Sequence, residues 1–176
     1  QIKESEILAL VSSDEFNSLK YCTAFKKRNG EENIWQFEHN NIQEFLAAKA
    51  LSKLEFDKII QFIAFSHNQN KLIPSWVNTL AFLFSILNVE SNLFKKLLEW
   101  LLENEKEVII KFEPDKVAED FRVQIFQGIF NHYKFHDVWI SSNKFSEKEL
   151  VRFGESESNL RFLINEVKSE KNTRTV

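Results

Sequence analysis

The sequence is poor in residues that interrupt regular structure. Its 176 residues include three glycines, two prolines, one cysteine and no methionine. So few turn-forming residues leave little room for the many tight connections of a β-sandwich. Eighteen phenylalanines and four tryptophans stand beside many leucines and isoleucines, which favours helices packed by large apolar side chains. We therefore predict a mainly α-helical protein.

The chain also lacks a dominant charge of one sign. Its 23 lysines and arginines are interspersed with 26 aspartates and glutamates, which gives a net charge of −3. A protein that depends on phosphate contacts needs a strong basic field, which this composition does not supply. We do not expect nucleic acid to be a general partner.

Disulfide, secretion and membrane signals are missing as well. Cys22 is the only cysteine, and we find neither a glycosylation sequon nor a signal peptide, a combination typical of the reducing cytoplasm. The longest apolar run, 72–87, is interrupted by Pro74 and falls short of the ~20 residues that span a bilayer. Because the chain opens at Gln1 within a helical pattern, has no methionine and ends in a charged tail, we expect a piece of a longer cytoplasmic protein with no membrane contact.

The first 53 residues predict a short helix followed by a β-hairpin. Ser12 and Glu15 have the spacing of a capping box, so a helix should cover 14–20. Aromatic, β-prone segments at 21–27 and 33–38 flank a polar turn that contains Asn29-Gly30, a strong hairpin signal. A helix followed by a hairpin is typical of a winged helix, here a partial one.

A longer helix should follow the hairpin. Asn40 is the expected N-cap and Gln43 its capping-box partner. The predicted apolar face of this helix consists of Ile42, Phe45, Leu46, Ala50 and Leu51.

Beyond Lys53 the pattern predicts helices only. They are expected at 55–66, 73–88, 91–104, 115–133, 146–153 and 157–168. Their spacing suggests helix pairs, as in a HEAT-like array, although no strict sequence period proves repeats. We predict two domains, 1–53 with the partial winged helix and its one hairpin, and 54–176 with the α-helical, HEAT-like array.

The segment FEHNNIQEFLAAKAL, from Phe37 to Leu51, resembles the signature that closes the winged helix of NACHT-type STAND NTPases. That family includes animal NOD-like receptors and bacterial anti-phage proteins. Its pattern is an aromatic, any residue, His, a few residues, then Gln-Glu-aromatic-Leu/Phe-Ala-Ala. The matching positions are Phe37, His39, Gln43, Glu44, Phe45, Leu46, Ala47 and Ala48. The sequence departs from the pattern at Ile42, where the family often has an aromatic.

The resemblance implies a role for His39. In the family this histidine contacts the phosphates of bound ADP and holds the module closed until a trigger releases it. The chemistry is reasonable, because an imidazole just before a helix can donate a hydrogen bond to a phosphate oxygen. His39 would be a sensor of ADP in the full-length parent, with no catalytic residue in this chain; Gln43, Glu44 and Phe45 are expected to cap and pack.

The same resemblance sets the expected function. The sequence contains no GxxxxGK[S/T] phosphate loop, so we expect no ATP hydrolysis by this chain alone, with ADP or ATP and Mg²⁺ bound elsewhere in the parent. The chain would be a regulatory module for signalling or anti-phage defence that contacts its own NACHT core and protein partners, in a parent that oligomerises on activation. The alternative is a winged-helix nucleic-acid-binding protein with a helical oligomerisation domain.

Other candidate residues have simpler interpretations. His132 and His136 share a helix face with Asp137 beside them, but no further ligand pattern accompanies them, so we predict surface histidines and no metal site. Cys22, in an aromatic strand context, is expected to be buried and inert.

The remaining basic and aromatic residues are assigned to the surface and to the core. The basic residues Lys26, Lys27 and Arg28 are followed by Glu31 and Glu32, which favours a solvated turn over a nucleic-acid contact. The aromatic residues expected in the core are Trp76, Trp100, Phe121 and Trp139.

Overall fold

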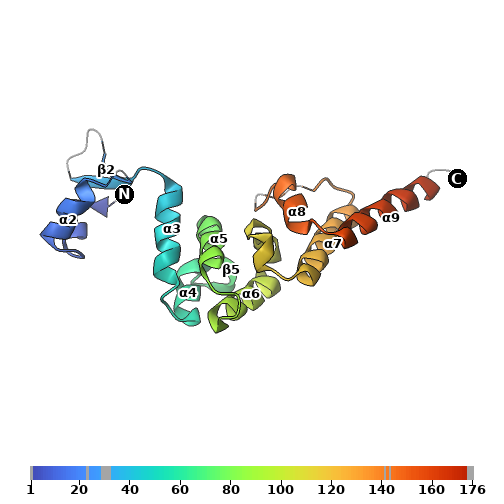
Figure 1. The fold of residues 1–176 in the computed structure, drawn as a ribbon, viewed down its shortest axis with the longest axis horizontal. Helices are drawn as coiled ribbons and strands as arrows, with labels where there is room; N and C mark the ends of the chain where they lie inside the picture. The colour runs from blue at the N-terminus through green and yellow to red at the C-terminus, as the bar shows by residue number, and fades with distance from the viewer. Residues whose placement is uncertain (1, 23, 29–32, 141, 143, 174–176) are drawn as a thin grey trace. The chain divides into compact units, whose positions relative to one another are not determined.

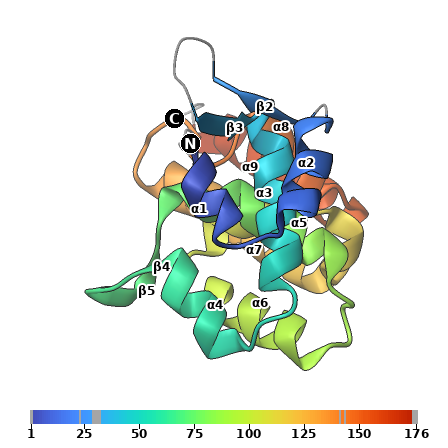
Figure 2. The same ribbon diagram turned by 90° about the vertical axis from the view of Figure 1, so that its left-hand side faces the viewer.

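The protein is mainly helical, as predicted. A computed structural model describes residues 2–22, 24–28, 33–140, 142 and 144–173. Helices account for 66% of the structure. The chain divides into two compact units, Gln1–Ala47 and Ala48–Val176 (Figures 1 and 2). Among the described residues we find no helix with both the length and the apolar character that crossing a bilayer requires.

The first unit combines two short helices with a small sheet. Its elements are β1 (Ile2–Lys3), α1 (Glu4–Leu8), α2 (Ser13–Lys20), β2 (Phe25–Lys27), β3 (Ile34–Phe37) and the start of α3 (Asn40–Leu51). The strands form an antiparallel sheet in the order β1-β3-β2, so the first strand pairs with the last. The predicted hairpin between β2 and β3 is confirmed, whereas its Asn29-Gly30 turn lies outside the described residues.

Four buried side chains hold this unit together. Ile7, Phe16, Phe25 and Trp35 form its core. The Trp35 ring stacks on Phe25 at 5.3 Å and meets Phe16 edge-on at 5.4 Å between ring centroids. Its indole N–H donates to Glu4 Oε2 at 3.0 Å, so α1, α2 and the hairpin are all tied to one tryptophan.

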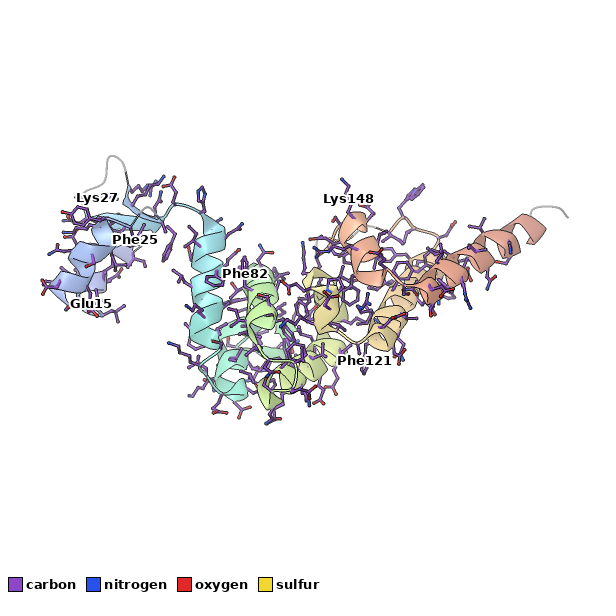
Figure 3. The ribbon with its side chains drawn as sticks, in the orientation of Figure 1. Glu15, Phe25, Lys27, Phe82, Phe121 and Lys148 are labelled. Carbon is purple, nitrogen blue, oxygen red and sulfur yellow. The ribbon has the colours of Figure 1, made fainter. Side chains whose placement is uncertain are left out.

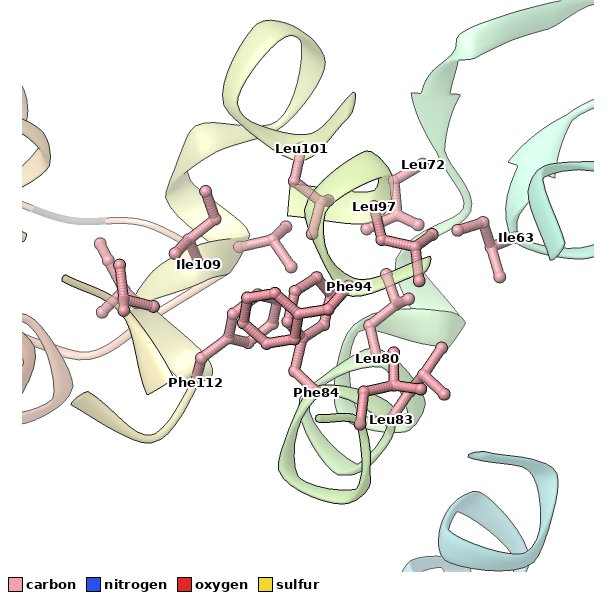
Figure 4. Packing of buried hydrophobic residues seen from close by; sticks show 14 of the residues in the cluster. Ile63, Leu72, Leu80, Leu83, Phe84, Phe94, Leu97, Leu101, Ile109 and Phe112 are labelled. Carbon is pink, nitrogen blue, oxygen red and sulfur yellow. The ribbon is translucent and has the colours of Figure 1, made fainter. Parts of the chain in front are cut away.

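The second unit contains the larger core. Its elements are α4 (Phe56–Ile63), β4 (Ala64–Phe65), β5 (Asn68–Leu72), η1 (Pro74–Trp76), α5 (Val77–Ile86), α6 (Asn92–Asn104), η2 (Lys106–Lys111), η3 (Pro114–Lys116), α7 (Glu119–Phe135), α8 (Glu147–Gly154) and α9 (Glu157–Thr173). Phe84 of α5 lies at the centre, stacked on Phe112 at 4.0 Å and edge-on to Phe94 at 4.9 Å (Figure 4). The abundant phenylalanines therefore join α5, α6 and the end of η2.

A second hairpin corrects the prediction that only helices follow Lys53. β4 and β5 pair antiparallel, with Ala64 opposite Leu72. The polar sequence of β5 carries no strand pattern, but its last residue, Leu72, is 4% exposed and its amide donates to Glu105 Oε1 at 3.3 Å. Tertiary contacts thus select a strand that local preference does not indicate.

The capping box predicted from Ser12 and Glu15 is confirmed, and a second helix begins with the same arrangement. Ser12 accepts from the Glu15 amide at 3.3 Å, and the Glu15 carboxylate accepts from the Ser12 amide at 2.8 Å. Ser146 and Glu149 repeat this arrangement at the start of α8, at 3.3 and 2.7 Å.

Two aromatic side chains expected in the core are exposed instead. Trp139 is 93% exposed, because it follows the end of α7 in a segment without regular structure. Phe121, labelled in Figure 3, is 45% exposed in the first turn of α7. Trp76 and Trp100 are partly buried against the core, as predicted.

Candidate functional site

The candidate site begins where the hairpin ends. Phe25 and Phe37 are opposite each other in the strand register, and their ring centroids lie 5.3 Å apart. The Glu38 amide donates to the Ala24 carbonyl at 2.8 Å, which extends the pairing one step past β3. These contacts fix the backbone that leads into His39.

His39 stands at the junction between the hairpin and α3. Its carbonyl oxygen accepts from the amides of Ile42 at 3.1 Å and Gln43 at 3.5 Å, so His39 itself occupies the N-cap position. The prediction that Asn40 is the N-cap is therefore wrong by one residue, because the first helical hydrogen bond already closes on His39. The imidazole is exposed and adjoins a helix end that favours anions.

An ion pair neutralises the acidic residue next to His39. Lys26 Nζ lies 2.5 Å from Glu38 Oε2. The hydrogen bond from Lys26 is the main reason that the pKa of Glu38 lies below its usual value, and the charge attraction of the same lysine adds to it. Lys26 of β2 is therefore paired with the residue that directly follows β3. The same pair offsets the negative charge of Glu38 beside the imidazole of His39.

The apolar face predicted for α3 is only partly buried. Ala48 and Leu51 are 0% and 4% exposed and belong to the core of the second unit. Phe45 and Leu46 are 40% and 44% exposed, and Ala50 is exposed too. The structure therefore buries Leu51 of the predicted apolar face and leaves Phe45, Leu46 and Ala50 exposed.

The histidine pair of α7 forms no assembled metal centre. His132 and His136 lie one turn apart with ring centroids at 4.5 Å, and His136 Nδ1 is 2.7 Å from the His132 carbonyl oxygen. Both are exposed at the end of α7, as predicted. In the described part of the chain no three His, Cys, Asp or Glu side chains gather where they could hold a metal ion.

Cys22 is exposed, which corrects the prediction of a buried strand cysteine. The helix α2 extends to Lys20 and β2 begins only at Phe25, so Cys22 lies in the connection between them. The predicted strand at 21–27 is therefore shortened from its N-terminal end.

A polar joint between α7, α8 and α9 was not predicted. Arg122 Nη1 donates to the carbonyl oxygens of Phe153 at 2.9 Å and Glu155 at 3.2 Å, where α8 ends. Asn159, 3% exposed, donates to the Gly154 carbonyl at 2.7 Å and accepts from Gln127 at 3.1 Å. No sequence spacing indicates the contacts of Arg122 and Gln127, because each joins residues more than 30 positions apart.

Comparison with known proteins supplies no further assignment. No protein-family model, curated protein or solved structure matches the chain.

Proposed function

We propose that the chain is the C-terminal part of a NACHT winged helix followed by the start of a helical, HEAT-like region of a STAND NTPase. The observation that carries this proposal is the position of His39, exposed between the last strand of a hairpin and the first residue of α3. This position, directly before the helix that contains the rest of the motif, supports the proposed role.

The topology of the first unit supports the winged-helix assignment. Strand, two helices and a hairpin follow one another, and the sheet order is β1-β3-β2. This is the order of a winged helix from its first strand onward, with the wing between β2 and β3. The two helices pack against the sheet through Ile7 and Phe16.

In this proposal His39 contacts a phosphate of ADP that is bound to the NACHT core of the parent protein. The exposed imidazole can donate one hydrogen bond to a phosphate oxygen, and the adjacent helix end favours negative charge. ADP would hold the regulatory module closed, and the helical second unit would relay the trigger through protein contacts. The cellular role would be signalling or anti-phage defence in the cytoplasm.

A nucleic-acid-binding role has less support. Lys26, one of three basic residues near the wing, is paired with Glu38. This ion pair partly neutralises the positive charge that a contact with a nucleic-acid phosphate would need.

The test is His39→Ala in the full-length parent, with retained ADP measured after purification and ATPase activity measured without trigger. We expect retained ADP to fall and basal activity to rise. His67→Ala is the matched control, because it removes another exposed imidazole, from the β4–β5 hairpin. Unchanged ADP retention in the His39→Ala protein would refute the sensor role.

A further inference from the structure

Two of the four histidines lie together at the C-terminal end of α7. His132 and His136 are four positions apart, and their ring centroids are 4.5 Å apart. Both residues are exposed, so an ion can reach them from solvent. Side chains at this spacing share one helix face, which allows two imidazoles to bind the same metal ion.

Backbone hydrogen bonds hold this end of α7 in place. The Asp137 amide donates to the Lys134 carbonyl at 3.0 Å. The Val138 amide donates to the Tyr133 carbonyl at 3.2 Å. Asp137 has a φ of 51°, so the two bonds form the Schellman motif that closes a helix. The spacing of the two imidazoles is therefore fixed by the fold before any ligand binds.

A further contact selects the nitrogen that His136 can offer to a ligand. His136 Nδ1 lies 2.7 Å from the His132 carbonyl oxygen. A carbonyl oxygen can only accept, so Nδ1 carries the proton of the neutral ring and Nε2 keeps the lone pair. Histidines that bind metals almost always donate their other ring N–H in this way, which fixes the tautomer and raises the basicity of the ligand nitrogen. His136 thus has the second hydrogen bond that a metal ligand needs.

The charges beside His132 do not oppose a cation. His132 lines a cavity of about 320 Å³ together with Glu105, Lys106, Glu107 and Lys144. Lys144 is ion-paired with Glu105 and lies 3.8 Å from Glu107, so the two carboxylates balance the two lysines. The cavity also leaves space for waters, which complete the coordination of an ion that has open positions.

The charges on the other side of the pair are balanced as well. Lys134 of α7 is ion-paired with Glu166 of α9. Asp137 adds a carboxylate next to His136. The carbonyl end of a helix itself favours positive charge, so the end of α7 is a suitable place for a divalent ion.

We propose that His132 and His136 chelate one divalent transition-metal ion of the class that imidazole suits, namely Cu²⁺, Ni²⁺ or Zn²⁺. Nε2 of His136 and one ring nitrogen of His132 bind the ion, and water occupies its remaining positions. The spacing of the pair did not by itself predict a metal site, whereas the ring contact, the His136 tautomer and the closed helix end support one. The inference is independent of the nucleotide-sensing role of His39.

The first test is isothermal titration calorimetry of the whole chain with CuCl₂, NiCl₂ or ZnCl₂ at about pH 7.5, where histidine is largely neutral. A Cys22→Ser background removes the exposed thiol. We expect the pair to bind Cu²⁺ most tightly, as the general order of divalent-metal affinities requires. An excess of MgCl₂ should not displace the ion, because Mg²⁺ prefers oxygen ligands. Absence of saturable binding of all three transition metals up to about 1 mM would overturn the proposal.

The second test identifies the imidazoles that bind. His132→Ala and His136→Ala should each weaken Zn²⁺ binding at least about tenfold, because each replaces a chelate by a single ligand. The control is the double variant His39→Ala, His67→Ala, which removes the other two histidines and should bind Zn²⁺ as before. A loss in the control that equals the loss in the two single variants would refute the assignment.

The third test examines the spacing. His132→Ala combined with Asn131→His keeps four histidines but separates the pair by five positions, which places the two rings on different helix faces. This variant should bind Zn²⁺ no more tightly than His132→Ala alone. Recovery of wild-type affinity would contradict the chelate geometry.

Nuclear magnetic resonance of the unmodified chain reports on the site without any variant. Long-range proton–nitrogen spectra should show the Nδ1–H tautomer of His136. Zn²⁺ should shift the ring signals of His132 and His136 and leave those of His39 and His67 unchanged, and acid should reverse the shift because protons compete for the ligand nitrogens. The opposite tautomer of His136, or shifts confined to His39 or His67, would exclude the proposed site.

Discussion

Gly154 closes α8 at a point where another side chain leaves no space. A Cβ atom at this position would lie 2.2 Å from Phe126 Cδ2 and 2.7 Å from Cγ. Phe126 is 6% exposed in the core, so its ring has little freedom to move away. The backbone is held as well, because the Gly154 carbonyl accepts from Asn159 and the preceding carbonyl accepts from Arg122. We expect Gly154→Ala to destabilise the second unit.

The magnitude follows from two opposing contributions. Overpacking of a well-packed site costs about 1–3 kcal/mol. Replacing glycine by alanine in a helix returns at most about 1 kcal/mol, and less at the last helical residue. The net loss should therefore be about 1–2 kcal/mol of the free energy of unfolding.

Gly128→Ala provides a matched control of opposite sign. Gly128 lies within α7, and a Cβ atom there would meet nothing within 4 Å. The same substitution should therefore stabilise the protein by about 0.5–1 kcal/mol.

The assay is urea unfolding followed by tryptophan fluorescence, since three of the four tryptophans belong to the second unit. The Gly154→Ala midpoint should fall and the Gly128→Ala midpoint should rise. Adding Phe126→Leu to Gly154→Ala should recover part of the lost stability, because leucine leaves free some of the space that the Phe126 ring occupies. If both alanine variants shifted the midpoint in the same direction, the steric account of Gly154 would be wrong.

Three further predictions concern hydrogen-bonded side chains. Burial alone would raise the pKa of Glu149, but hydrogen bonds from the Ser146 amide and hydroxyl and from Lys111 outweigh it and lower the pKa. The ionised Glu149 carboxylate therefore stabilises the fold at neutral pH, and this stabilisation is lost as the pH falls through 4.5 and below. Urea midpoints should show that Glu149→Gln is less stable than wild type at pH 7, by about 1 kcal/mol. In acid the two proteins should be nearly equal in stability. Ser91 accepts from the Phe94 amide at 3.1 Å, so Ser91→Ala should cost about 1 kcal/mol, whereas Ser91→Asp, which keeps the cap, should cost little. Trp35→Phe removes the hydrogen bond to Glu4 and should speed amide hydrogen exchange in the first unit while leaving the second unit unchanged.

The parts of the fold that could be predicted depend on contacts between near neighbours. Ser12 with Glu15, and Ser146 with Glu149, satisfy the free amides of their own helix starts, so three residues of sequence contain the whole interaction. The β2–β3 hairpin is similar, because only six residues of sequence separate its two strands. Such features need no information about the rest of the chain.

The parts that could not be predicted depend on contacts between distant residues. β5 is a strand because Leu72 is buried and its amide reaches Glu105, 33 positions away. The joint formed by Arg122 and Asn159 likewise exists only after α7, α8 and α9 have packed. Large aromatic residues are mostly buried, so the residue type alone predicts that Trp139 lies in the core. The structure instead leaves it exposed.

The candidate site combines both kinds of information. Strand alternation predicts that Trp35, Phe37 and His39 share one face. Trp35 is 6% exposed in the core, yet His39 is exposed, because β3 ends at Phe37 and the chain bends through Glu38 and His39 before α3 begins. Had the strand continued, the imidazole would have followed Trp35 toward the apolar core. The early end of the strand is therefore what leaves His39 accessible, and accessibility is the property that a phosphate contact from outside this chain requires.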